Sequence, residues 1–420
     1  MASPTTSASE SMQQKQSTQQ SNKPKQPQHK HDRLITRDMA LVMLATFCFM
    51  SSNMLANPIV AGYAESLGAS GMLMGVVAGS MSFISLFCRP IAGNLSDRTS
   101  KRTLVAAGTV LYFAAGLLYY FADSPIMLIM ARVINGVGFA CCSVCLATWM
   151  SLLLPIRHMG AGMGLYGTMN ALAMAVGPAF GIRAQKYIGY RLTFLSSLVL
   201  AAIMLIATLM VKNGGQPVRK KQTSISATKK HRFSIRSILE PRVVPLSLTF
   251  MMFAIAYFAN QSFIVSYVQS RHLPVSSDLF FMFYAVALLV LRLGLRDLFD
   301  SKGFRFWLTV CSLGMLAMLA CMTFLFNDWM LLLAAIFTAV GYGLMSSVTQ
   351  AQAVVIAGRE RSGIANSTYY AGIDLGMSVG PFVGGLVYGR LSAVWFYPVL
   401  MLTMPVAWLI YLLCVRRVSR

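Results

Sequence analysis

Asp374 is the acidic residue best placed for chemistry, because it is the only one of the thirteen Asp and Glu that lies deep inside a long apolar run. Counted from Gly363, eleven residues at about 1.5 Å each place it roughly 16 Å into that run. A carboxyl group in such surroundings must be paired, hydrogen-bonded or protonated. Two interpretations of Asp374 are open. In the first it carries a proton or serves as the counter-charge of a cationic substrate, and in the second it is a structural, hydrogen-bonded Asp.

The residues around Asp374 predict which side of a helix it occupies. On a helical wheel four glycines form one stripe, and Asp374 lies on the opposite side together with Tyr370. Small residues let helices approach closely, so the stripe is expected to pack and the other side to face a polar cavity. The stripe consists of Gly372, Gly376, Gly380 and Gly384.

Arg132 is a second charged residue inside an apolar run. It is a candidate for function, or a structural Arg bonded to backbone carbonyls. Four uncharged polar side chains within such runs need a partner or water, and they are candidates for substrate binding or for bonds between helices: Asn53, Asn57, Asn260 and Gln261.

The composition identifies the environment of these residues. The chain is 56% hydrophobic and 11% charged, with a mean hydropathy of +0.62, against roughly 25% charged residues in an ordinary soluble protein. It is therefore a membrane protein. Because a span needs about 20 apolar residues, we predict twelve helices and an all-α fold, at residues 39–62, 71–92, 103–121, 126–149, 159–182, 192–211, 243–268, 277–296, 304–326, 329–353, 362–388 and 392–415.

The basic residues predict the topology. Most of the 35 Lys and Arg fall in the N-terminal tail, the even-numbered loops and the C-terminus. This bias predicts cytoplasmic termini of a multi-pass protein in the cell membrane, and it explains the net charge of +22 without a nucleic-acid partner. The odd-numbered loops hold only Arg183, Lys186, Arg191, Arg271 and Arg390.

Composition divides the chain into five parts. Residues 1–37 are rich in Ser, Gln, Lys and Thr and are predicted to be a disordered cytoplasmic tail. Residues 212–242 form a basic cytoplasmic linker, which serves as positive-inside anchoring or binds anionic lipid heads. The linker separates two six-helix bundles, at 38–211 and 243–415, and residues 416–420 form a short cytoplasmic C-terminus.

An internal repeat supports the division into six and six helices. RPIAGNLSD, which starts at Arg89, matches RLGLRDLFD, which starts at Arg292, at an offset of 203 residues. GPAFG from Gly177 and GPFVG from Gly380 share that offset. Parallel halves of this kind predict a substrate site near the midplane, where the halves meet.

The loop GNLSDRTSKR after the second helix resembles the signature of the major facilitator superfamily. In that superfamily the loop is understood to latch the two halves in one conformation, and solvated positive-inside charges are the simpler interpretation. The C-terminal copy keeps Asp300 but has Arg296 and Ser301 in place of the Gly and the Arg, so a latch would be asymmetric. The matching residues are Gly93, Asp97, Arg98, Lys101 and Arg102.

Two further signatures resemble the same superfamily. RVINGVG, from Arg132, is similar to the pattern in its fourth helix, an intramembrane Arg followed by spaced glycines. Glycines and prolines in the fifth and eleventh helices resemble a pattern associated with antiporters, which favours export, and ordinary tight packing is the alternative interpretation. They are Gly177, Pro178 and Gly181, and Gly376, Gly380, Pro381 and Gly384. The superfamily's first and seventh helices line its central cavity, which implies that role for the Asn and Gln residues named above.

These patterns predict a secondary transporter that works by alternating access and exports small apolar or amphipathic compounds in exchange for protons. One alternative is proton-coupled uptake of a sugar or organic anion, with Arg132 as the anion partner. A remote alternative is a polytopic membrane enzyme, but the five His are scattered over tail and loops. A sensory or structural membrane protein is a further possibility.

We expect a monomer in the lipid bilayer, with protons and a small molecule as partners, and no enzyme activity, cofactor, metal or nucleic acid. No GxxxxGK[ST] phosphate loop is present. The CCSVC run at Cys141–Cys145 has no His nearby in the sequence to complete a metal site. All eight Cys are predicted to be reduced thiols.

Overall fold

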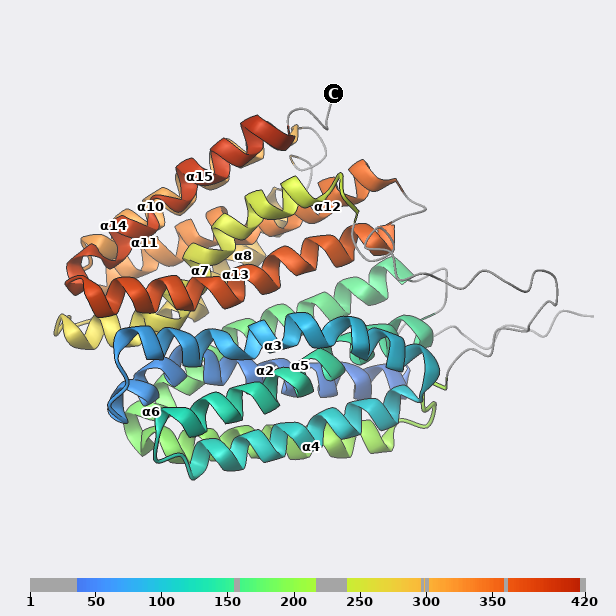
Figure 1. Cartoon of the computed structure of the whole chain (residues 1–420). Coiled ribbons are helices and arrows are strands. Elements are labelled where there is room, and N and C mark those ends of the chain that lie inside the picture. Colours follow the sequence, from blue (N-terminus) through green and yellow to red (C-terminus); the bar gives the residue numbers. More distant parts are fainter. Residues whose placement is uncertain are drawn as a thin grey trace, which may run out of the picture. The chain divides into compact units, whose positions relative to one another are not determined.

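The structure is a computed structural model that describes residues 36–154, 159–216, 240–295, 298, 302–358 and 362–415. Residues 1–35 of the predicted tail, 217–239 of the predicted linker and 416–420 at the C-terminus lie outside this range, so those predictions are not tested. Contacts divide the chain into Met1–Thr36 and Arg37–Arg420, and the fold described below is that of the second unit (Figure 1).

The described residues form helices and no strands, which confirms the predicted all-α fold. We call residues 37–216 the N-terminal half. It contains α2 (Arg37–Ser66), α3 (Gly71–Arg98), α4 (Lys101–Tyr120), α5 (Pro125–Leu153) and α6 (Met159–Met210). The 52 residues of α6 are two helical stretches that meet at Gly189, whose φ of 77° lies in the left-handed region that glycine adopts without strain.

Residues 240–415 are called the C-terminal half. Within it, the π-helical turn η3 joins α11 to α12, and short elements follow one another at the C-terminal end. The elements are α7 (Val244–Ser270), α8 (Ser277–Gly294), α10 (Phe304–Thr323), α11 (Asp328–Thr338), η3 (Ala339–Leu344), α12 (Met345–Ala357), α13 (Ser362–Arg390), η5 (Ala393–Trp395), α14 (Phe396–Leu400), α15 (Thr403–Ile410) and η6 (Tyr411–Val415).

Ten of these described stretches are long and apolar enough to cross a membrane. The stretch Leu165–Met210 counts once although it overlaps both the fifth and the sixth predicted spans. Helix α8, which matches the eighth predicted span, is not among the ten. Each of the twelve predicted ranges overlaps a helix, while the number of spans that cross the bilayer stays a prediction.

Glycines bring the main helix pairs of each half together. In the N-terminal half α6 packs on α2, where a Cβ on Gly177 would lie 2.8 Å from Cβ of Met54. In the C-terminal half α13 packs on α7, where a Cβ on Gly380 would lie 2.7 Å from the carbonyl oxygen of Ile255. Larger residues would force these backbones apart, because contacts this short leave no room for another carbon.

The most extensive contacts between the halves join α3 with α13, α6 with α8, and α2 with α7. In Figure 1, α3 and α13 lie side by side. Their contact includes Gly71 at the start of α3 and Gly385 near the end of α13, and a Cβ on Gly71 would lie 2.9 Å from the Gly385 carbonyl oxygen. The helix ends that meet there belong to odd-numbered loops.

Candidate functional site

An ion pair between the two halves lies at the centre of the candidate site. Asp374 on α13 is 2% exposed, and its partner is Arg89 on α3. Nη2 of Arg89 donates to Oδ1 of Asp374 at 3.0 Å, and Nε of Arg89 lies 2.7 Å from Oδ2. The acidic side chain that the sequence singled out in the C-terminal half is therefore bound by a base from the N-terminal half.

The two contacts of this pair differ in quality. The Nε–Oδ2 approach is short but lacks hydrogen-bond geometry, so the Nη2–Oδ1 contact is the aligned hydrogen bond. Oδ2 is thus a buried oxygen with no hydrogen bond within the described part of the chain. The guanidinium of Arg89 also lies 5.4 Å from the ring centroid of Phe139, a distance at which a cation is attracted to an aromatic face.

The pair explains where each face of α13 points. The glycine stripe packs on α7, as Gly376 against Ala254 illustrates, and Asp374 lies on the other face, as predicted. Part of that face packs on α3, where a Cβ on Gly75 would lie 3.1 Å from Cα of Phe382. Tyr370, one turn before Asp374, is 44% exposed. The polar cavity on this face stays a prediction, because periodicity gives the direction of a side chain but not the helix it meets.

Arg89 is a site residue that the sequence analysis missed. It served there only as a landmark of the internal repeat. The available signal was its position within an apolar stretch just before the loop signature, where a base has the same need for a partner as Asp374. Pairing the two would have required knowing that the second and eleventh helices are neighbours.

Arg132 is held within the N-terminal half. It is 2% exposed, and both of its Nη atoms donate to Oδ1 of Asn57 at 3.2 Å. Its Nη2 also donates to the carbonyl oxygen of Ala78 at 2.6 Å, and its Nε to that of Val77 at 3.3 Å. This arrangement matches the structural interpretation, in which the guanidinium joins α2, α3 and α5.

A layer of unpartnered polar groups lies along the helices between Arg132 and Arg89. On α2, Asn53 falls one turn before Asn57, and both its amide oxygen and nitrogen are buried without a hydrogen-bond partner among the described residues. Buried groups of this kind are ordinarily bonded to water or to a ligand. Three more members of the layer, on α3 and α5, are Ser82 Oγ, Ser85 Oγ and Asn135 Oδ1.

The remaining predicted residues lie in the C-terminal half and have contacts of their own. Oδ1 of Asn260 accepts a 2.9 Å bond from the Tyr397 hydroxyl, while its Nδ2 has no partner within the described residues. Gln261 reaches Sδ of Met54 in the other half at 3.8 Å. Tyr370 is 44% exposed, and its hydroxyl accepts a 3.5 Å bond from Gln350.

Sequence comparison decides the family. The sequence model of the Major Facilitator Superfamily matches residues 42–328 and 303–420. The chain belongs to this superfamily. It is a multi-pass membrane transporter, as the resemblance of the loop signature implied.

Relatives of this superfamily member span several substrates. It is 23% identical over 372 residues to an uncharacterized MFS-type transporter of Methanocaldococcus jannaschii, covering 85% of this chain and 92% of the relative. It is 19% identical to multidrug resistance protein 2 of Bacillus subtilis, over 79% of this chain and 84% of the relative. The human synaptic vesicular amine transporter is 26% identical over 172 residues, which cover 41% of this chain and 33% of that protein.

Solved structures share the fold. A POT family transporter in complex with 5-aminolevulinic acid aligns with a TM-score of 0.74 at 11% identity, covering 91% of this chain and 97% of that one. The nucleoside transporter NupG aligns with a TM-score of 0.68 at 13% identity, covering 92% and 100%.

The superfamily's loop signature binds helix ends within the N-terminal half. Nζ of Lys101 donates to the Ser96 carbonyl at the end of α3, and Nη2 of Arg102 donates to the Val211 carbonyl just after α6. Arg98 is exposed, and nothing lies within 4 Å of a Cβ placed on Gly93. The Asp97 side chain and all of Asp300 lie outside the described residues, so their part in the predicted latch is not tested.

Proposed function

We propose that this transporter exports small apolar or amphipathic compounds in exchange for protons, and that the Arg89–Asp374 pair couples the two movements. The observation that carries the proposal is a buried carboxylate of one half bound by a guanidinium of the other, at 3.0 and 2.7 Å. Charge and conformation are joined at this point, because any change in the charge of Asp374 alters a contact between the halves.

The chemistry of the pair supports a proton or a cation as the controlling ligand. Two unit charges about 4 Å apart attract each other by about 4 kcal/mol at the effective dielectric constant of about 20 that suits proteins. A proton on Oδ2, which has no hydrogen bond within the described residues, would remove most of that attraction. A cationic group of a substrate would do the same by replacing Arg89 at the carboxylate. Either event favours separation of α3 from α13.

The substrate class rests on the surroundings of the pair. Phe139, which lies under Arg89, is stacked on Phe49 with ring centroids 5.4 Å apart, and such surfaces suit apolar and aromatic groups. The unpartnered polar layer that includes Asn53 offers a few hydrogen bonds beside them. An apolar wall with few polar groups is typical of small-molecule sites. Export is in keeping with the similarity to a multidrug resistance protein and an amine transporter.

Uptake of an organic anion is the second candidate, and the environment of Arg132 weighs against it. An anion would need the guanidinium, which is already engaged by the Asn57 amide oxygen and by two carbonyl oxygens of α3. Displacing these partners would leave buried polar groups unsatisfied, which costs about 1–3 kcal/mol each.

The proposed topology decides which side of the structure faces the outside of the cell. With cytoplasmic termini, the odd-numbered loops are extracellular, and the Gly71–Gly385 contact closes the extracellular side. The Arg89–Asp374 pair lies further along the same two helices, toward the cytoplasm. In this topology the chain consists of two six-helix bundles in the cell membrane, joined by the basic linker.

The proposal is tested by flux. Cells with and without the protein are compared for susceptibility to a panel of amphipathic compounds, and each hit is then measured in proteoliposomes of purified wild type under an imposed pH gradient. The expected result is accumulation that follows the gradient and disappears when a protonophore collapses it. Accumulation that persists unchanged without the gradient would contradict proton coupling.

A further inference from the structure

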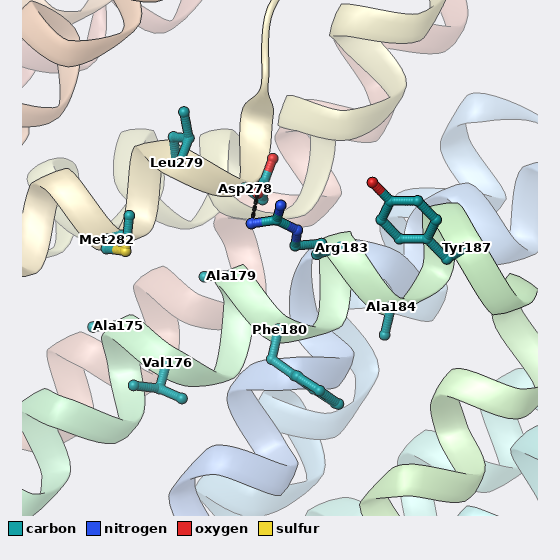
Figure 2. Close-up of a pocket in the computed structure, with 10 residues that line it drawn as sticks. All are labelled: Ala175, Val176, Ala179, Phe180, Arg183, Ala184, Tyr187, Asp278, Leu279 and Met282. Carbon is teal, nitrogen blue, oxygen red and sulfur yellow. Dashed lines mark ion pairs between the residues drawn. The ribbon is translucent and has the colours of Figure 1, made fainter.

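A groove separate from the ion pair lies between α6 of the N-terminal half and α8 of the C-terminal half (Figure 2). Its volume is about 440 Å³, and most of its lining is apolar. One wall is the stretch of α6 around Val176 and Phe180, and the other is the start of α8 with Met282. Because the walls come from different halves, the groove exists only while these helix segments stay together.

The apolar wall of the groove belongs to the outer surface of the bundle. The side chain of Phe180 is 51% exposed and that of Met282 is 46% exposed, although both lie in helices of a multi-pass membrane protein. Exposed apolar surface of a membrane-spanning bundle is covered by lipid acyl chains. The occupant with access to this groove is thus a molecule of the bilayer.

One end of the groove carries charge. In Figure 2, the side chains of Arg183 and Asp278 point toward each other at this end, and Tyr187 lies one turn further along α6. Nη1 of Arg183 is 3.9 Å from Oδ2 of Asp278, which is too long for a hydrogen bond. The Arg183 side chain is 67% exposed, so its donors are open to an anion at the surface.

The charge of Asp278 does not cancel this site. Asp278 lies in the first turn of α8, where the helix dipole favours a negative charge. The carboxylate is therefore stabilised by its own helix, and the guanidinium of Arg183 keeps its capacity for a second partner. A guanidinium matches a phosphate group through two parallel hydrogen bonds.

We infer that this groove binds one phospholipid, with its phosphate at Arg183 and an acyl chain between α6 and α8. Val176 lies seven residues before Arg183, about 10 Å along α6, so the headgroup and the upper part of one chain fit along the wall. A lipid in this position touches both halves. It stabilises the conformation in which α6 and α8 are together.

The test is native mass spectrometry of the full-length protein in detergent, titrated with palmitoyl-oleoyl phosphatidylglycerol. The comparison lipid is the glycerol with the same two chains and no phosphate. Wild type is expected to retain one phosphatidylglycerol at least tenfold more tightly than the phosphate-free lipid. Arg183→Gln should lose that preference, since it removes the charge from an exposed side chain without disturbing the fold. The matched control is Arg390→Gln, an exposed Arg at the end of α13 that does not line the groove.

A second variant tests the apolar part. Ala179 lines the groove wall, and Ala179→Phe should fill it, so that phosphatidylglycerol binding weakens about tenfold although Arg183 is present. Unchanged thermal unfolding would show that this variant is folded. Equal lipid retention in Arg183→Gln and Arg390→Gln would overturn the site. Retention of the phosphate-free lipid as tightly as phosphatidylglycerol would also overturn it, because the contact would then be ordinary acyl-chain solvation.

Discussion

Nη2 of Arg89 donates a 3.0 Å hydrogen bond to Oδ1 of Asp374, and this bond joins residues 285 positions apart in the sequence. Each residue sits in a helix of a different half, and Asp374 is 2% exposed. The Arg89 side chain is 24% exposed, so the pair is open to solvent on the side of Arg89 and closed on the side of Asp374. The bond therefore responds to ligands and protons that reach this interface, which makes it suitable for linking transport to a change of conformation.

The first prediction concerns the stability of the pair. Arg89→Gln leaves a buried carboxylate without its cation, which is expected to destabilise the protein by about 3–5 kcal/mol unless the carboxylate takes up a proton. The double variant Arg89→Gln/Asp374→Asn should regain much of this loss, because no uncompensated charge remains. Thermal unfolding of the single and double variants in detergent measures the difference.

The control for this comparison of single and double variants is the exposed pair Arg191–Asp123, whose side chains are 53% and 77% exposed. Asp123→Asn should leave the unfolding temperature unchanged within error, since surface pairs contribute little. If the double variant at Arg89 and Asp374 is as unstable as the sum of the singles, the two side chains are not energetically coupled.

The sequence predicted the helices and the faces of some of them, because both follow from local composition. The all-α fold follows from apolar runs, and the packing of the Gly376 face follows from spacing. Contacts between distant segments were not predictable in this way. Nothing in the spacing around Arg89 shows that α3 lies on α13. The charged stretch from Arg183 to Arg191 predicted a loop between two spans, whereas the structure continues the helix α6 through it, with the change of direction at Gly189.

The second prediction concerns the glycine contact between α3 and α13 that is proposed to close the extracellular side. A Cβ on Gly385 would lie 2.7 Å from Cα of Gly75, so Gly385→Ala should push α3 and α13 apart and favour the other conformation. Spin labels at Phe121 and Phe324, two exposed residues at odd-numbered loops, should report a longer mean distance in a cysteine-free background. Gly167→Ala is the control, since nothing lies within 4 Å of a Cβ there. Identical distance distributions in the two variants would rule out this contact as a closure.

The third prediction separates a structural from a binding role for Arg132. Lys has no planar fork, so Arg132→Lys cannot serve Asn57 and the α3 carbonyls together. We expect a loss of about 1–3 kcal/mol in stability, and a similar loss for Asn57→Ala that does not add to it. Thermal unfolding gives the stabilities, and flux gives the KM. A stable Arg132→Lys variant with a strongly raised KM would instead favour an anionic substrate.

The fourth prediction concerns the loop signature. Asp97→Asn and Arg98→Ala should each cut transport severely with expression nearly intact, because a loss of a few kcal/mol from one of two conformations changes their ratio by orders of magnitude. Asp300→Asn should do less, since Ser301 stands where the second copy would need its Arg. Flux per purified molecule is the measurement. Wild-type rates in both N-terminal variants would argue against a latch.

The last prediction addresses the central claim that Asp374 couples transport to protons. Asp374→Asn fixes the neutral form of the side chain, and Asp374→Glu keeps the acid at a shifted position. The decisive measurement is substrate flux in proteoliposomes, with and without an imposed pH gradient, for wild type and Asp374→Asn. We predict that the Asn variant loses accumulation driven by the gradient while downhill exchange continues, and that the Glu variant retains part of the driven activity. If Asp374→Asn still concentrates substrate against its gradient with unchanged pH dependence, Asp374 is structural and the coupling passes through another group.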